Sequence, residues 1–269
     1  MRRLIALLPL LVLGTAAFAA PGLKPGGFAE FKAELPRELR LVAGQGQLSP
    51  VEHALITIGA PANLDPAHEW PVLVISATSD PQYNSSRRLL AAYADTALKA
   101  GWIVVAVDPM EAVAVDNDSV GLRLALNTTA LAVLELQWPA AARARLAFGG
   151  FSGGAKYSGW LAAAFASRGR NVAGIYLAGI NADAVISSAR HFNVLNAEFK
   201  RTPIFLQYGD ADGISTPSDH WNLHDELRRV GFKNVRIVSF RGAHEVDPTP
   251  LRKALDWFRD LAAPAETAK

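Results

Sequence analysis

The most informative segment of the chain reads Arg145-Leu-Ala-Phe-Gly149-Gly150-Phe151-Ser152-Gly153-Gly154. A short apolar run leads into it, and a stretch with helical spacing follows it directly. The segment contains the pattern Gly-x-Ser-x-Gly, in which a serine lies at a cramped turn between a strand and a helix. Because such a turn leaves no room for side chains two residues before and after the serine, both positions require glycine. We therefore predict a strand, a tight turn that presents Ser152, and a helix.

Short apolar runs lie on both sides of this segment, and several are nearly continuous in Val, Ile and Leu. They span residues 40–43, 54–59, 72–75, 103–107, 146–148, 172–177, 204–208 and 235–240. Segments with helical spacing span residues 85–100, 120–137, 155–167, 217–230 and 248–261. Strands that alternate with helices in this way form a mainly parallel sheet that is buried on both faces. The sequence thus predicts one α/β domain, built on a doubly wound, mainly parallel eight-stranded sheet with helices on both faces.

The beginning of the chain has the three parts of a secretory signal peptide: Met1-Arg2-Arg3, an apolar run, and the small-residue triplet Ala17-Phe18-Ala19. The apolar run is shorter than the roughly 20 residues of a membrane-spanning helix. We expect cleavage after Ala19 and a periplasmic or secreted protein that is not inserted in a membrane. An uncleaved anchor and twin-arginine export are the alternatives. Residues 20–36 are expected to form an N-terminal arm, and residues 37–269 the domain.

Charge and cysteine content exclude several function classes. The chain has 27 basic and 25 acidic residues, and loss of Arg2 and Arg3 with residues 1–19 would leave 25 of each. A balanced charge disfavours nucleic acid as a partner, since nucleic acid requires a basic surface. The chain has no cysteine, which excludes a thiol nucleophile and a zinc–thiolate site.

A serine nucleophile needs a base that takes its proton and an acid that orients the base. His244 follows the last strand-like run and precedes the final helix, so it is the expected base. The loop Gly209-Asp210-Ala211-Asp212-Gly213 offers two carboxylates. We assign Asp212 as the partner of His244 and Asp210 as a cap of the turn through backbone hydrogen bonds. The backbone N–H of Gly153, at the start of a helix, is placed to face a developing oxyanion.

A metal site is the less favoured interpretation of two other histidines. His220 and His224 are one helical turn apart, which suits metal binding, but the sequence supplies no evident third ligand. We therefore predict neither a metal nor a cofactor.

The chain resembles the α/β-hydrolase superfamily over residues 37–263. The resemblance rests on residues 150–154 as nucleophile elbow, residues 209–212 as acid loop and Gly242-Ala243-His244 as histidine loop. Residues 60–75 are similar to the corresponding part of carboxylesterase, feruloyl-esterase and dienelactone-hydrolase relatives. The resemblance implies a serine hydrolase that cleaves a carboxylic ester through an acyl-enzyme intermediate on Ser152.

The loop after residues 72–75 departs from the family pattern. Members usually carry His-Gly there, whereas this chain has Ser76-Ala77-Thr78-Ser79. The resemblance implies that the backbone N–H of Thr78 is the second oxyanion donor beside Gly153. Loss of one such donor costs about 3 kcal/mol in the transition state. Tyr83 and Tyr157 are alternative donors.

The expected substrate follows from the interval between residues 178 and 202, where a lid often enters this fold. The interval is too short for a large lid, so we expect an open site that accepts a small-molecule or polymer-attached ester. Phe151, Phe192 and Trp221 are candidates to line it. A peptidase or amidase of the same fold, and a catalytically weak binding protein, are the competing hypotheses.

Overall fold

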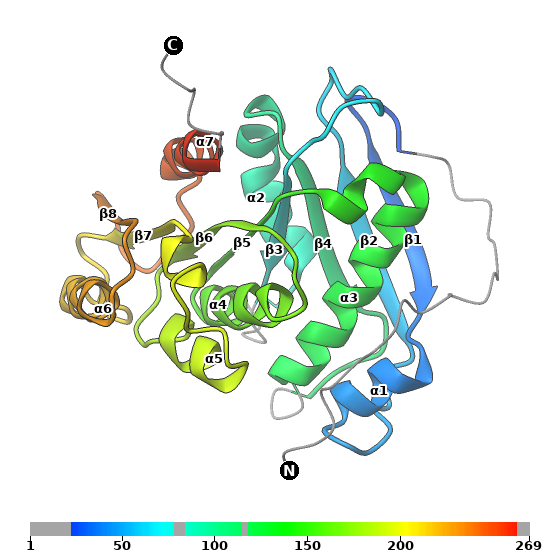
Figure 1. Cartoon of the computed structure of the whole chain (residues 1–269), viewed down its shortest axis with the longest axis horizontal. Coiled ribbons are helices and arrows are strands. Elements are labelled where there is room, and N and C mark those ends of the chain that lie inside the picture. The colour runs from blue at the N-terminus through cyan, green and yellow to red at the C-terminus, as the bar shows by residue number, and fades with distance from the viewer. Residues whose placement is uncertain (1–22, 78–83, 115–117, 263–269) are drawn as a thin grey trace.

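The computed structural model describes residues 23–77, 84–114 and 118–262 (Figure 1). The expected signal peptide, Thr78 and Tyr83 lie outside these ranges. The strands are β1 (Phe28–Glu34), β2 (His53–Gly59), β3 (Val72–Ser76), β4 (Ile103–Pro109), β5 (Leu146–Phe151), β6 (Val172–Ala178), β7 (Ile204–Gly209) and β8 (Val235–Phe240). The helices are α1 (Arg37–Ala43), α2 (Ser86–Lys99), α3 (Val120–Gln137), α4 (Gly153–Ala166), α5 (Val185–His191), α6 (Pro217–Val230) and α7 (Thr249–Ala262), with 3₁₀ turns at Pro139–Arg143 and Phe199–Arg201.

The strands form one eight-stranded sheet in the order β1-β2-β4-β3-β5-β6-β7-β8. β2 is antiparallel to both of its neighbours, and every other adjacent pair is parallel. The predicted mainly parallel, eight-stranded sheet is therefore confirmed. Among the described residues, no helix is long and apolar enough to cross a membrane.

The N-terminal end of the sheet differs from the prediction in two respects. Residues 40–43, expected as a strand, belong to α1, which buries Leu39 and Ala43 on one face. A four-residue apolar run does not distinguish a strand from one face of a short helix. The first strand is instead β1, within the expected arm, where Ala29 and Phe31 are buried and alternate with the exposed residues Phe28, Glu30 and Lys32. That alternation is typical of an edge strand with one buried face.

Helices cover both faces of the sheet, as predicted. Val72 and Val74 of β3 belong to a core cluster shared with α1, α3, α4, α5 and α6. Leu73 and Ile75 point to the opposite face, into a cluster shared with α2 and α7. The two helical layers can be followed in Figure 1, where α3, α4 and α5 lie in front of the sheet and α2 behind it. The fully buried parallel strands thus leave their carboxyl-terminal edge as the place where loops carry chemistry.

Helix ends lie where the sequence indicates them. α6 begins with Pro217, and Thr216 and Asp219 form a reciprocal capping box at its start. α6 ends at Gly231, whose φ of 104° is left-handed. The capped start of α6 directly follows the acid loop and therefore holds its carboxyl-terminal end in place.

Candidate active site

Ser152 lies between the end of β5 and the start of α4. Its φ and ψ are 55° and −120°, a left-handed conformation that is strained for a residue with a side chain. The backbone N–H of Ser152 donates to the carbonyl of Ala178 at the end of β6, at 2.8 Å. The predicted strand, turn and helix are confirmed, and the turn projects the serine at the carboxyl edge of the sheet.

Two glycines make this turn possible. A Cβ on Gly150 would lie 2.6 Å from the backbone oxygen of Ser76, and a Cβ on Gly154 would overlap the same oxygen. The elbow is therefore packed backbone against backbone on the end of β3. Only glycine at both positions permits this approach.

His244 lies on the loop after β8 and faces the serine. Its Nε2 is 3.1 Å from Ser152 Oγ, and its ring lies 4.7 Å from the ring of the buried Phe151, tilted by 41°. Gly209 gives the loop room, because a Cβ there would come within 2.5 Å of the Gly242 carbonyl oxygen. The histidine loop thus crosses the end of β7 in close contact and brings His244 to the elbow.

Asp212 completes the arrangement and is buried, with 4% of its surface exposed. Its Oδ2 is 2.7 Å from His244 Nδ1, and its Oδ1 accepts from the backbone N–H groups of Ile214 and Ser215, both at 2.8 Å. Burial by itself would raise the pKa of Asp212, but the hydrogen bonds from His244, Ser215 and Ile214 outweigh it and hold the pKa below its ordinary 3.8. An ionised Asp212 accepts the Nδ1–H of His244 and leaves Nε2 as the acceptor for the Ser152 hydroxyl.

Asp210, the other carboxylate of this loop, has a different position. Its Oδ1 accepts from the backbone N–H of Gly242 at 3.1 Å, and its own N–H donates to the Phe240 carbonyl at 2.9 Å. Asp210 therefore braces the histidine loop against the end of β7, whereas Asp212 is the carboxylate that contacts His244. The structure brings Asp212 to the histidine, as the sequence predicts.

Of the two expected oxyanion donors, Gly153 lies within the described residues and Thr78 lies outside them. Gly153 opens α4, where the first backbone N–H groups have no acceptor one turn earlier in the helix. Tyr157 is not a replacement donor, because its hydroxyl donates to the carbonyl of Asp118 at 2.9 Å. Burial, with the adjacent Asp118 charge, raises the pKa of Tyr157 to about 12. Gly153 is thus the one predicted donor that the described residues place beside Ser152.

His220 and His224 do not form a metal pair. His220 is fully buried, and both of its ring nitrogens contact backbone groups, at Thr216 and Ile180. His224 contacts the carboxylate of Asp225. Among residues 23–77, 84–114 and 118–262, no cluster of three metal-ligating side chains is present.

The aromatic candidates have separate roles. Phe192 packs edge-on against Trp160, with ring centroids 6.0 Å apart, and so joins α5 to α4. Phe151 is buried behind His244. Trp221 is 48% exposed and donates its indole N–H to the Tyr208 hydroxyl. The interval 178–202 contains only α5 and a 3₁₀ turn, which agrees with the predicted lack of a large lid.

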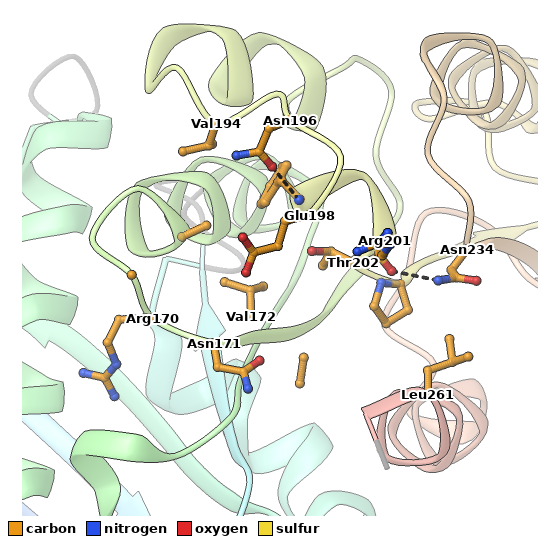
Figure 2. A pocket seen from close by; sticks show the side chains of 15 residues that line it. Arg170, Asn171, Val172, Val194, Asn196, Glu198, Arg201, Thr202, Asn234 and Leu261 are labelled. Atoms are coloured by element: carbon orange, nitrogen blue, oxygen red, sulfur yellow. Dashed lines mark hydrogen bonds between the residues drawn. The ribbon is translucent and has the colours of Figure 1, made fainter. Parts of the chain in front are cut away.

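A hollow of about 550 Å³ lies elsewhere on the molecule. Figure 2 shows its polar lining, which includes Asn171, Glu198, Arg201 and Asn234. Asn171 precedes β6, and Asn234 precedes β8. The hollow therefore lies at the amino-terminal edge of the sheet, opposite to Ser152, and takes no part in the chemistry of the serine.

No model of a known protein family and no curated protein matches the sequence. Solved structures do match the fold. A Xanthomonas campestris protein, described as an α/β serine hydrolase without a lid, is 18% identical over 91% of this chain and 100% of its own, with a TM-score of 0.58. A cold-adapted esterase from an Arctic intertidal metagenomic library is 14% identical over 87% of this chain and 93% of its own, with a TM-score of 0.57. The acylaminoacyl peptidase of Pyrococcus horikoshii is 14% identical over 86% of this chain but 40% of its own, with a TM-score of 0.53. These similarities establish the α/β-hydrolase fold.

Proposed function

We propose that this chain is an exported serine hydrolase that cleaves a carboxylic ester. The observation that carries the proposal is that one imidazole joins Ser152 Oγ, at 3.1 Å, to Asp212 Oδ2, at 2.7 Å. A strained serine turn held in register with a histidine and a buried carboxylate is the arrangement that activates a serine hydroxyl. The signal peptide predicted at residues 1–19 supports export.

In the first half of the reaction, Ser152 Oγ attacks the ester carbonyl carbon while His244 Nε2 takes the hydroxyl proton. Asp212 stabilises the imidazolium that results. The tetrahedral intermediate places its negative oxygen toward the N–H of Gly153 and, by resemblance, that of Thr78. When the carbon–oxygen bond to the alcohol breaks, His244 returns the proton to the leaving alcohol, and the acyl group remains on Ser152.

In the second half, water replaces the alcohol. His244 takes a proton from the water as its oxygen attacks the acyl carbon, and then returns a proton to Ser152 Oγ as the acid leaves. The cycle consumes one water and needs no cofactor. The short interval between β6 and β7 supports a site open to short-chain, aryl or polymer-attached esters.

The relatives by fold favour an ester over an amide. The esterase and the lidless serine hydrolase are matched over at least 93% of their length, whereas the acylaminoacyl peptidase is matched over 40% of its length. This chain therefore corresponds to nearly the whole of the first two proteins and to only a part of the peptidase. Amide cleavage by the same triad is the second candidate.

Turnover of matched substrates tests the proposal. Purified protein from residue 20 onward is assayed with p-nitrophenyl acetate, butyrate and octanoate, and with the p-nitroanilides of the same acids. We expect hydrolysis of the short esters, anilide rates at least about 10²-fold lower, and loss of both activities in Ser152→Ala. Faster anilide cleavage would favour the amidase. A folded protein that turns over neither class would favour the ligand-binding hypothesis and would implicate the altered loop at Ser76.

A further inference from the structure

His220, on the first turns of α6, is a fully buried histidine that the triad does not use. Its Nδ1 is 3.0 Å from the Thr216 carbonyl oxygen, which only accepts, so Nδ1 carries the proton. Its Nε2 accepts the backbone N–H of Ile180 at 3.1 Å. Both ring nitrogens are thus satisfied in the neutral imidazole, and the ring joins the start of α6 to the segment after β6.

Gly179 and Ile180, directly after β6, form the wall of the candidate active site beside His244. Gly179 has a left-handed φ of 59°, and a Cβ on it would lie 3.2 Å from His244 Cε1 and 2.8 Å from the ring of Phe151. Glycine at this position therefore lets the backbone contact the face of the site where His244 lies. Any shift of Ile180 would move Gly179 relative to the imidazole.

A second hydrogen bond links the same segment to the acid loop. The hydroxyl of Ser215 donates to the Gly179 carbonyl at 2.7 Å, and the Ser215 N–H donates to Asp212 Oδ1 at 2.8 Å. Ser215 thus fastens Gly179 to the loop that carries Asp212, and His220 fastens Ile180 to the helix that follows this loop. The two bonds fix the relative positions of the acid, the wall and His244.

From this geometry we infer that His220 is a positioning residue: it holds the Ile180 amide, and through Gly179 the orientation of His244, without touching substrate. The inference rests on the proposed function, because it assigns a role relative to that triad. This role of His220 differs from packing alone, because it requires a hydrogen-bond acceptor for the Ile180 N–H at the position of Nε2.

The surroundings of His220 favour the neutral ring. The charged groups that act on it are Asp212, Asp219 and His244, and its ring lies 5.1 Å from that of Tyr208. Burial lowers the pKa of His220 below its ordinary 6.5, and the hydrogen bond to the Thr216 carbonyl and the two carboxylates only partly offset the effect. A protonated ring would have no acceptor for the Ile180 N–H.

Two uncharged substitutions of His220 distinguish a role as hydrogen-bond acceptor from a role in packing. In His220→Gln the side-chain oxygen can reach the position of Nε2 and accept from Ile180, whereas His220→Asn places its amide near Nδ1 and leaves Ile180 unpaired. His224→Asn, one turn along the same helix, is the matched control. For each variant, kcat and KM for p-nitrophenyl butyrate, the rate of labelling by a fluorophosphonate and the melting temperature are measured.

We expect His220→Asn to lower kcat and the labelling rate by about 10- to 100-fold with little change in KM, since a small displacement of catalytic groups has that cost. His220→Gln should recover most of the rate, and His224→Asn should match the parent protein. Equal rates in the Asn and Gln variants, or losses that follow only the melting temperature, would overturn the inference.

Amide hydrogen exchange separates a failure of this inference from a failure of the proposed function. Peptides that contain Ile180 should exchange faster in His220→Asn than in His220→Gln, whether or not the parent protein reacts with the probe. Should His220→Asn not fold, Ser215→Ala removes the neighbouring bond to Gly179 and should lower kcat in the same way. Unchanged Ile180 exchange, or unchanged kcat in Ser215→Ala, would contradict the link.

Discussion

The backbone oxygen of Ser76 lies directly against Gly154, so closely that a Cβ on the glycine would overlap it. Ser76 ends β3, and Gly154 is in the first turn of α4. The contact fixes the nucleophile elbow to the neighbouring strand, and the loop that departs from the family pattern begins at the same residue. The position of Ser152 and the position of the end of β3 are therefore set together.

Substitution at Gly154 tests this contact. In Gly154→Ala the added methyl group must displace β3 or the elbow, and forced overpacking of this kind typically costs about 1–3 kcal/mol. We expect a lower free energy of unfolding in urea and a large loss of esterase activity. Gly213→Ala is the control, because nothing lies within 4 Å of a Cβ there. An equally small effect of both substitutions would show that the elbow tolerates side chains.

The two carboxylates of the acid loop should behave differently. Asp212→Asn removes the anion that orients and stabilises the His244 imidazolium, and we expect kcat to fall by roughly 10⁴-fold. Asp210→Asn weakens only the brace to Gly242, so kcat should change little while thermal stability falls. Ester hydrolysis and thermal unfolding of both variants check this. The reverse pattern would transfer the catalytic role to Asp210.

Acid should destabilise the protein through His220. Because burial lowers the pKa of His220 below 6.5, the unfolded chain binds a proton before the folded chain does as the pH falls from 7. This histidine therefore reduces the free energy of unfolding as the pH drops through 6.5 toward its folded pKa. Asp212, with a pKa held below 3.8, stabilises the fold above that value and loses the effect only in stronger acid.

Urea unfolding of the parent protein and His220→Gln at pH 7, 6 and 5 measures the contribution of His220. The difference in the free energy of unfolding between them should shift in favour of the Gln variant as the pH falls. A difference that is independent of pH would contradict the assignment of a neutral, buried His220.

A buried ion pair at the start of α3 gives a further prediction. Arg123 donates two hydrogen bonds of 2.7 Å to Asp118, and both side chains are at most 6% exposed. Burial would lower the pKa of Arg123, but Asp118 outweighs it and the pKa is raised. Asp118→Ala leaves a buried charge without its partner and should cost about 3–5 kcal/mol. In Asp118→Leu/Arg123→Met much of this loss should be recovered, as thermal unfolding would reveal.

Most of the sheet could be predicted from the sequence, because strands buried on both faces are continuous in Val, Ile and Leu and their helices carry glycine and proline at the ends. The arrangement of Ser152, Asp212 and His244 could be predicted because each residue follows a strand at the carboxyl edge of the sheet. The glycines two residues before and after Ser152 indicate the nucleophile. The positions of Asp212 and His244 after β7 and β8 indicate the acid and the base.

What could not be predicted depends on contacts between distant parts of the chain. The apolar run at residues 40–43 is too short to reveal the period of a helix. β1 pairs with β2 although α1 lies between them in the sequence. The hydroxyl of Tyr157 donates to the carbonyl of Asp118, 39 residues away, and nothing in the sequence indicates this contact. His220 gave no sequence signal for its role, because Ile180 lies 40 residues away.

The most direct test of the account is covalent labelling of the purified protein from residue 20 onward by a fluorophosphonate, read by mass spectrometry of the peptide that contains Ser152. We expect one phosphonyl group per chain, located on Ser152, with no labelling of Ser152→Ala. Labelling at another residue, or none in a folded protein, would contradict the assignment of Ser152 as an activated nucleophile.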